Sequence, residues 1–109
     1  METKDNKYAE RDAAAKALIG PSVRRVTVDG HEPGIEHVGY AKFPGLSTLS
    51  QMRQLMETDE MGALDQMFNK CMVKDLTDNE IFADQEIRFA VMQALPELIN
   101  KKKARLQRV

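Results

Sequence analysis

The chain has 109 residues, of which 42% are apolar and 30% are charged, and its formal net charge is -1. These proportions are typical of one globular domain and argue against a disordered chain. The near-zero net charge excludes a general basic field of the kind that attracts nucleic acid.

Residues 1–20 are predicted to form an N-terminal helical arm. The alanine-rich stretch favours a helix from Asn6 to Ile19, and Gly20-Pro21 ends it. Its thin apolar stripe consists of Tyr8, Ala15, Leu18 and Ile19. Because so few apolar groups cannot hold a helix firmly, we expect a mobile arm unless a partner or another subunit covers it.

Residues 21–45 are predicted to be a β-hairpin region. The β-branched stretch from Val26 to Val28 favours a first strand, and Asp29-Gly30 and Pro33-Gly34 are turn signals. A second strand is predicted within residues 35–43, where alternate positions fall on opposite faces. An isolated hairpin is marginal in water, so this one must pack on the helices or on a neighbour.

Residues 46–109 are predicted to form a helical core. Thr48 and Gln51 have the spacing of a capping box for its first helix, and Thr58 or Asp59 is expected to cap the second. Apolar residues of the second helix recur every three or four positions as far as Met72, which is the strongest periodic signal in the chain.

The rest of this region is predicted to be a connection followed by a last helix. Residues 74–82 contain turn formers, and Ile81 and Phe82 are expected to pack back into the core. The last helix runs from about Asp84 to Leu95, where Pro96 interrupts it; Pro96 either starts a new helical segment, Glu97 to Gln107, or kinks one long helix. The predicted fold class is therefore mainly α with a small β-hairpin near the N-terminal third (α+β), in a single compact domain.

Six methionines other than Met1 lie between Met52 and Met92. Methionine is flexible and polarizable, so it is used on surfaces that adapt to varied partners, but it also fills gaps in ordinary cores. Both interpretations stay open here. The candidates for contact with a partner or another subunit are Met52, Met56, Met61 and Met67.

Three residues are candidates for a catalytic or metal-binding role: His31, His37 and Cys71. A metal site needs three or four ligands in fixed geometry, and Cys71 is far from both histidines in sequence. Cys71 lies on an apolar helical stripe, which predicts a buried, inert thiol instead of a nucleophile. No phosphate-binding glycine pattern occurs. We therefore predict no enzymatic activity, no cofactor and no metal, with a small enzyme or metal protein as a less favoured alternative.

The charges are distributed unevenly along the chain. Residues 101–108 carry five positive charges and no acid, and Lys101, Lys102, Lys103 and Arg105 are the second set of contact candidates. Such a segment binds phosphate backbones or interacts favourably with the negative C-terminal end of its own helix. The absence of interleaved aromatic residues disfavours nucleic-acid binding. A nucleic-acid-binding regulator remains the alternative function.

The middle of the chain is acidic. Residues 57–86 contain nine acids against two bases, Lys70 and Lys74. An acidic middle and a basic end favour head-to-tail self-association, which closes as a ring or continues as a spiral. The alternative is two solvated faces that never meet.

The compartment is predicted from what the sequence lacks. A single cysteine excludes an intrachain disulfide, and no apolar run is long enough to span a membrane. The first residues also lack the apolar stretch of a signal peptide. We expect an intracellular, soluble protein with no membrane partner.

The order of segments from Phe43 to Gln107 resembles that of the tail assembly chaperones of long-tailed bacteriophages. An extended region ends in Phe43-Pro44-Gly45, and two short helices follow before residues 69–75. A step at residues 79–82 leads to a last helix that opens at residues 84–86 and closes in a lysine run. The resemblance covers roughly the last two thirds of the chain and consists of a pattern of hydrophobics and turns.

This resemblance implies a function without catalysis. Such chaperones bind the long, helical tape measure protein, keep it soluble and help to recruit tail tube protein. They act in the host bacterial cytoplasm and are absent from the mature virion. In many such phages a longer form arises by ribosomal frameshifting, and the codons of Lys101–Lys103 are a candidate place for it.

Overall fold

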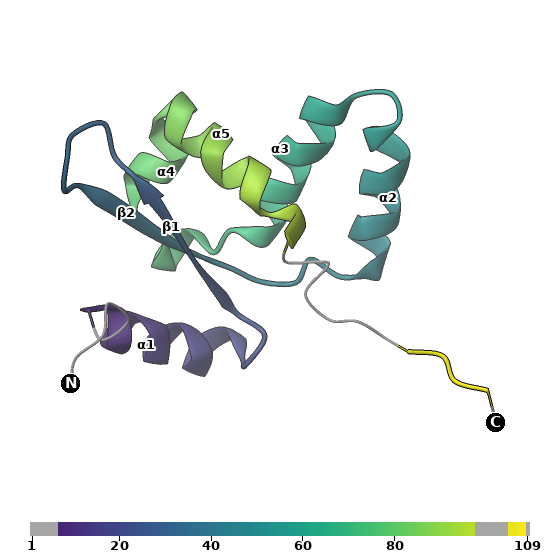
Figure 1. Ribbon diagram of the computed structural model, residues 1–109, viewed down its shortest axis with the longest axis horizontal. Coiled ribbons are helices and arrows are strands. Elements are labelled where there is room, and N and C mark those ends of the chain that lie inside the picture. The colour runs from purple at the N-terminus through teal and green to yellow at the C-terminus, as the bar shows by residue number, and fades with distance from the viewer. Residues whose placement is uncertain (1–6, 98–104, 109) are drawn as a thin grey trace.

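The computed structural model describes residues 7–97 and 105–108. Figure 1 shows a hairpin that separates one helix from a group of helices. In chain order the elements are α1 (Ala9–Ile19), β1 (Arg24–Asp29), β2 (Glu36–Ala41), α2 (Leu46–Met56), α3 (Glu60–Cys71), the 3-10 helix η2 (Lys74–Leu76), α4 (Asn79–Ala83) and α5 (Gln85–Ala94). The predicted class, mainly α with a small hairpin (α+β), is confirmed.

The hairpin is antiparallel, with Val26 opposite Gly39 and Val28 opposite His37. The second edge of β2 is also occupied, because residues 72–78 run along it. The backbone amide of Val73 donates to the carbonyl of Tyr40 at 2.8 Å, and residue 41 forms a bridge with residue 72. Gly39 permits this close approach, since a Cβ there would lie 2.7 Å from the Thr77 methyl group.

The two faces of the hairpin pack on different neighbours. Val26, Val28 and Ala41 belong to the main core with the helices, whereas Val38 and Tyr40 form a separate small cluster with Ala15 of α1. Figure 1 shows the consequence, with α1 on one side of the hairpin and α2 to α5 on the other. The side chains of β2 alternate between two faces as the sequence predicted, and both faces are buried.

Helix α1 is docked on the hairpin, which corrects the prediction of an arm that only a partner would cover. Its apolar contribution is as small as expected, because Ala15 is the one buried residue of the helix. Polar side chains supply the rest: Asp12 accepts from the Tyr40 hydroxyl at 2.6 Å and from Arg25 at 2.5 Å. The sequence prediction considered only the apolar residues of the helix, so it did not include these polar contacts with the hairpin.

The main core lies where α3, α4, α5 and the hairpin meet. Phe68, Cys71 and Ile81 are fully buried there, and the rings of Phe68 and Phe82 meet edge to face at 5.5 Å. The predicted packing of Ile81 and Phe82 into the core is confirmed. The predicted connection is more ordered than expected, because η2 and α4 lie within residues 74–83.

Two of the three helix starts predicted within residues 46–109 are confirmed. Asp59 caps α3, and Asp84 caps α5 by accepting from the amides of Glu86 and Ile87 at 3.0 and 3.1 Å. The prediction of a capping box at Thr48 is wrong, because α2 begins earlier, at Leu46, and no side chain caps it. The residue before it, Gly45, has a φ of 98°, which glycine adopts readily. The extra turn brings Leu46 into the helix.

Replacing Asp59 with alanine is expected to lower the free energy of unfolding by about 1 kcal/mol. The carboxylate accepts from the amide of Gly62 at 2.9 Å, and alanine leaves that amide without its intramolecular partner. Urea denaturation measures the loss. Asp59→Asn keeps an acceptor and should retain most of the stability, so an equal loss in both variants would refute the capping role.

Candidate partner-binding groove

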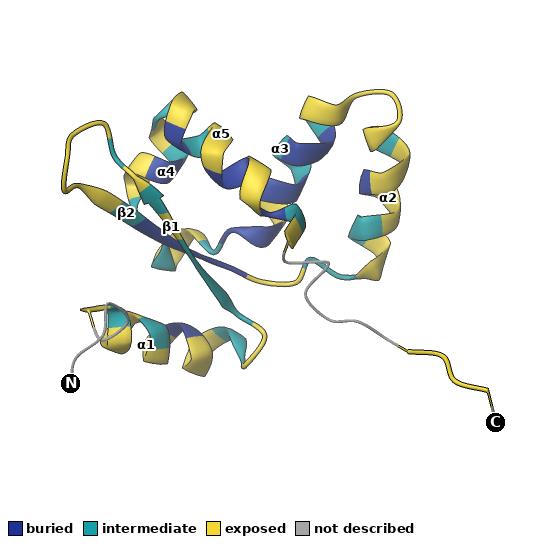
Figure 2. Ribbon diagram, in the orientation of Figure 1, coloured by how far each residue is buried: buried dark blue, intermediate teal, exposed yellow. Residues whose placement is uncertain are grey.

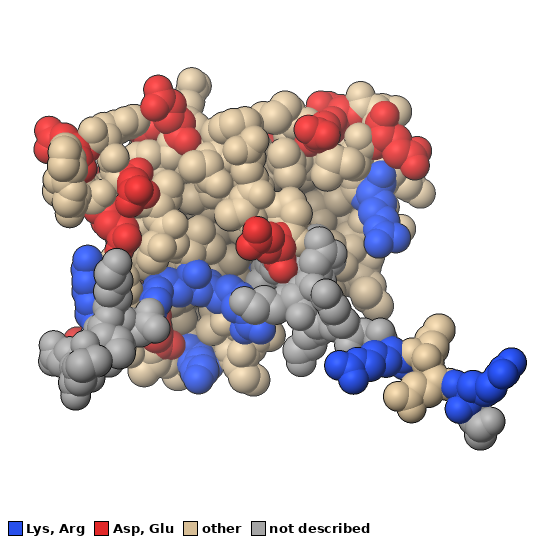
Figure 3. All heavy atoms as spheres, viewed as in Figure 1, with Lys and Arg blue, Asp and Glu red and all other residues tan. Residues whose placement is uncertain are grey.

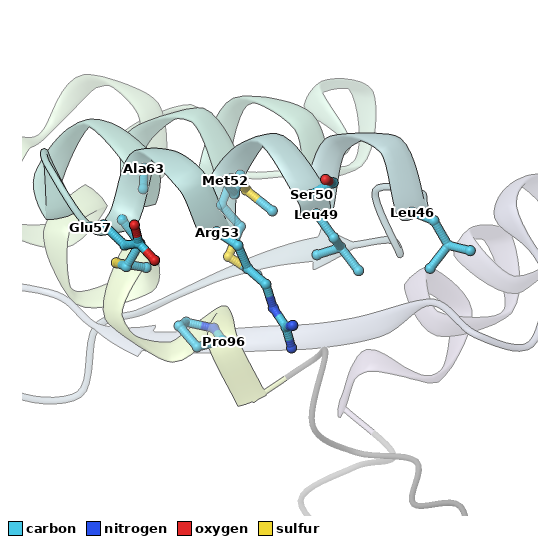
Figure 4. Close-up of a pocket in the computed structure, with 10 residues that line it drawn as sticks. Leu46, Leu49, Ser50, Met52, Arg53, Glu57, Ala63 and Pro96 are labelled. Atoms are coloured by element: carbon cyan, nitrogen blue, oxygen red, sulfur yellow. The ribbon is translucent and has the colours of Figure 1, made fainter.

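A groove of about 570 Å³ lies beside α2, between that helix, α3 and the end of α5. Its lining consists of Leu46, Leu49, Ser50, Met52, Arg53, Met56, Glu57, Ala63, Met67 and Pro96. Figure 4 shows the lining side chains of α2 along the length of that helix, with Arg53 reaching down on the side where Pro96 lies. Most of the lining is apolar, and Arg53 and Glu57 bring one charge of each sign to it.

The helical period explains why one side of α2 forms a wall of the groove. Residues 46, 49, 53 and 56 recur at three- and four-residue spacing and therefore share one face. Helix α2 packs on α3, and Met52 is its only buried residue. Figure 2 shows that most of α2 is exposed, whereas α3 and α5 are dark blue where they face the core. The helix thus lies at the margin of the fold with its apolar face incompletely covered.

The four candidate methionines occupy three kinds of position. Met52 and Met67 are only 5% and 3% exposed, so they form the inner wall of the groove. Met56 is 39% exposed and lines the groove from α2. Met61 is 49% exposed but does not line it. The structure therefore brings three of the four together and leaves Met61 apart on the first turn of α3.

The other methionines fill gaps in the core, as the alternative interpretation had it. Met72 and Met92 are buried in the main cluster with Phe68 and Val91. Both interpretations of the methionines thus describe part of the chain. Of the basic candidates, Lys101, Lys102 and Lys103 lie outside the described residues, and Arg105 is exposed in the segment 105–108, away from the groove lining.

Sequence reasoning missed several residues of the groove. Leu46 is 78% exposed and forms one end of the lining, and Pro96 joins it from the other end of the core. An earlier start of α2 would have placed Leu46 on the face of Leu49 and Arg53, so periodicity held a usable signal. No sequence pattern could have placed Pro96, because it reaches the groove only through the packing of α5 on α3.

The histidines meet acids from distant segments instead of their sequence neighbours Glu32 and Glu36. His31 Nε2 lies 2.6 Å from an Asp84 carboxylate oxygen, and His31 Nδ1 lies 3.8 Å from Glu86. His37 Nδ1 lies 4.0 Å from Glu80. Within residues 7–97 and 105–108, no group of three or more potential ligands is arranged to hold a metal ion.

The buried state of Cys71 is confirmed. The residue is fully buried, and desolvation raises the pKa of its thiol to about 11, against a smaller lowering by Lys42. A thiol with so high a pKa carries almost no thiolate at neutral pH, which is the nucleophilic form.

The contact between His31 and Asp84 is expected to make stability depend on pH. The hydrogen bond and the charge of Asp84 raise the pKa of His31 above 6.5, and the same hydrogen bond foremost lowers the pKa of Asp84 below 3.8. Protonated His31 therefore stabilises the fold fully below pH 6.5, and this contribution fades as the pH rises through the folded value. The contribution of Asp84 is present above pH 3.8 and fades as the pH falls.

The measurement is urea denaturation of the wild type and of His31→Gln at about pH 5 and about pH 9. At the lower pH we expect the wild type to have a higher free energy of unfolding than His31→Gln. At the higher pH the difference in free energy between the two proteins should shrink. Equal differences at both values would show that His31 does not titrate in contact with Asp84.

Charge is also divided in space. Figure 3 shows acidic side chains along much of the upper edge, including the loop between α2 and α3, with others at the left end and nearer the centre, and basic side chains mainly below, around α1 and in residues 105–108. Glu57 and Asp59 lie in the connection between α2 and α3, Glu60 begins α3, and Glu57 also lines the groove. The uneven distribution seen along the sequence is therefore also present on the surface, and head-to-tail association stays a prediction.

Comparison with known proteins places the fold. No protein-family model matches the chain, and no curated protein does. A solved structure is similar: that of an uncharacterised protein, rbstp2171, from Bacillus stearothermophilus, with a TM-score of 0.62 and 19% sequence identity. The two chains share a fold. The match covers 89% of this chain and 99% of the other, so the likeness extends over both the hairpin and the helices.

Among the described residues, no helix has both the length and the apolar character that crossing a membrane requires.

Proposed function

We propose that this protein is a tail assembly chaperone of a long-tailed bacteriophage, which binds helical segments of the tape measure protein in the groove beside α2. One observation supports this most: Met52, Met56 and Met67 converge on an open, mostly apolar groove. Amphipathic helices bind proteins by laying an apolar face into such a groove, and methionine lets the groove adapt to different sequences. The resemblance of residues 43–107 to tail assembly chaperones names the client.

The dimensions of the groove suit a short helical segment. Helix α2 has 11 residues. At 1.5 Å per residue its wall is about 16 Å long, which matches about three helical turns of a client. A segment of this size presents apolar side chains at positions i, i+3 or i+4 and i+7. One such contact is weak, and a long client with many similar segments gains affinity from many chaperones acting together.

Weak individual contacts also fit the later steps of assembly. The tail tube protein is the second partner in this proposal, and it displaces the chaperone as the tube forms around the client. Self-association in a ring or spiral keeps successive chaperones adjacent on the client. The protein then acts in the host bacterial cytoplasm and leaves before the virion is complete. It needs no enzymatic activity and no cofactor for this role.

The direct test is co-expression with the tape measure protein of the same tail gene cluster. We expect the tape measure protein to be soluble with the wild-type chain and to aggregate without it. The two proteins should co-purify in a complex that survives added salt, because apolar contacts are not screened. A tape measure protein that is equally insoluble with and without the chain would refute the proposal.

The alternative function is nucleic-acid binding through the basic segment, where Arg105 and Arg108 are exposed. Salt separates the two proposals, since phosphate contacts release counterions and weaken steeply as salt rises. Retention on immobilised DNA or RNA at low salt, lost on moderate salt addition and unaffected by changes in the groove, would favour this alternative.

A further inference from the structure

Helix α1 is attached mainly by polar groups. Ala15 is its one buried residue, and Leu18 points to solvent with most of its surface exposed. The surface under the helix is apolar at its centre, where Val38 and Tyr40 are buried, with Leu76 partly buried beside them. This cluster is separate from the main core. Removing α1 would therefore uncover a small apolar seat while the helical core stays intact.

Charged pairs around the seat hold the helix in place. Asp12 contacts Arg25 at 2.5 Å and the Tyr40 hydroxyl at 2.6 Å. Arg11 contacts Asp78 at 3.1 Å and donates to the carbonyl of residue 76 at 3.0 Å. The side chains of both ion pairs are partly exposed, so water and salt screen them. The attachment is thus specific in position but moderate in strength.

A short connection joins α1 to β1. Gly20 has a φ of 117°, and no heavy atom lies within 4 Å of the place where its Cβ would be. Pro21 and Ser22 follow as a turn before β1 begins at Arg24. A change of backbone angles at residues 20–22 redirects α1 as a unit, without altering the helix or the hairpin.

We infer that α1 exchanges between copies of this chain, so that the helix of one molecule docks on the hairpin seat of a second. The seat favours a second copy of α1 as its partner, because its charged groups are opposite in sign to Asp12 and Arg11 and lie where those side chains dock. A helix docked on a second molecule makes every contact that it makes when docked on its own hairpin. The equilibrium between the monomer and the exchanged form is therefore set by the connection at residues 20–22 and by protein concentration. This inference rests on the contacts of α1 and not on the groove or the client.

The wild-type chain allows a test without substitutions. Lys7 Nζ lies 3.8 Å from a Glu36 carboxylate oxygen, across the junction between the N-terminal segment and β2. Equimolar 14N- and 15N-labelled protein is unfolded and refolded together, treated with a carbodiimide that joins lysine to carboxylate, and digested for mass spectrometry. Exchange predicts Lys7–Glu36 linked peptides that carry one 14N and one 15N half, in a proportion that rises with protein concentration. Linked peptides of a single isotope at every concentration would overturn the inference.

A pair of charge reversals gives an independent measurement. Asp12→Arg places two positive groups together in a closed molecule, and Arg25→Asp places two negative groups together. In a mixture, each variant helix meets a seat of opposite charge on the other variant. Light scattering should show more association in the mixture than in either single variant alone, and the double variant Asp12→Arg/Arg25→Asp should associate to the same extent as the wild type. A mixture that associates no more than either variant alone would overturn the inference.

Discussion

Replacing Phe68 with alanine is expected to lower the free energy of unfolding by about 3–5 kcal/mol. The ring is fully buried at the junction of the main core. It packs edge to face with Phe82, and the Arg88 guanidinium lies 4.2 Å from its centroid. Alanine removes these contacts and leaves a cavity that the surrounding helices can only partly fill. A loss of this size is a large fraction of the stability of a domain of this length.

Phe89→Ala is the matched control, because Phe89 undergoes the same chemical change on the exposed side of α5. Urea denaturation should show a small change for Phe89→Ala and a large one for Phe68→Ala. Similar losses in both variants would contradict the assignment of Phe68 to the centre of the core.

Introducing glutamate at Leu46 and Met56 is expected to weaken client binding by about 2 kcal/mol or more, which is roughly thirty-fold in the dissociation constant. Both side chains are exposed and line the groove, so the substitutions place negative charges where an apolar helix face must dock. The fold should tolerate them because neither residue is buried. Titration of a tape measure protein fragment, followed by calorimetry, measures the change.

Met61→Glu is the control for this pair. Met61 is an exposed methionine on the neighbouring helix, outside the groove lining. We expect it to bind the client with unchanged affinity. If Met61→Glu weakened binding as much as the groove variants, the contact surface would lie on α3 and the proposed site would be wrong.

The parts of the fold that follow from local patterns were predictable from the sequence. Apolar residues at three- and four-residue spacing gave α3, and Asp59 and Asp84 gave the starts of α3 and α5, because a cap acts within one turn. Turn residues between a β-branched stretch and a stretch of alternating faces predicted the hairpin. These features depend on neighbours along the chain, which a sequence displays directly.

Features that depend on distant partners were not predictable in this way. The docking of α1 depends on Tyr40 and Asp78, which lie far along the chain from Asp12 and Arg11. The edge of β2 is covered by residues 72–78, which include the 3-10 helix η2 and have no strand signature in the sequence. Asp78 illustrates the point: its carboxylate accepts from the amide of Val38 at 2.8 Å, although it lies in a segment for which the sequence indicated only turn formers.

The candidate site was partly predictable for the same reason. Helical spacing grouped the methionines, but spacing within one helix does not determine which of them another helix covers. Met52 and Met67 became the inner wall because α2 packs on α3, and Met61 was left outside. The groove itself arises from three elements whose relative placement no local pattern encodes.

The most direct test of the central claim is to observe the methionine methyl groups by NMR while a helical fragment of a tape measure protein is added. The groove methionines are Met52, Met56 and Met67, and the other methionines within residues 7–97 are Met61, Met72 and Met92. We predict that the methyl signals of the first three shift or broaden as the fragment binds, while those of the other three stay in place. Binding that leaves the groove signals unchanged, or that moves Met61 alone, would contradict the account.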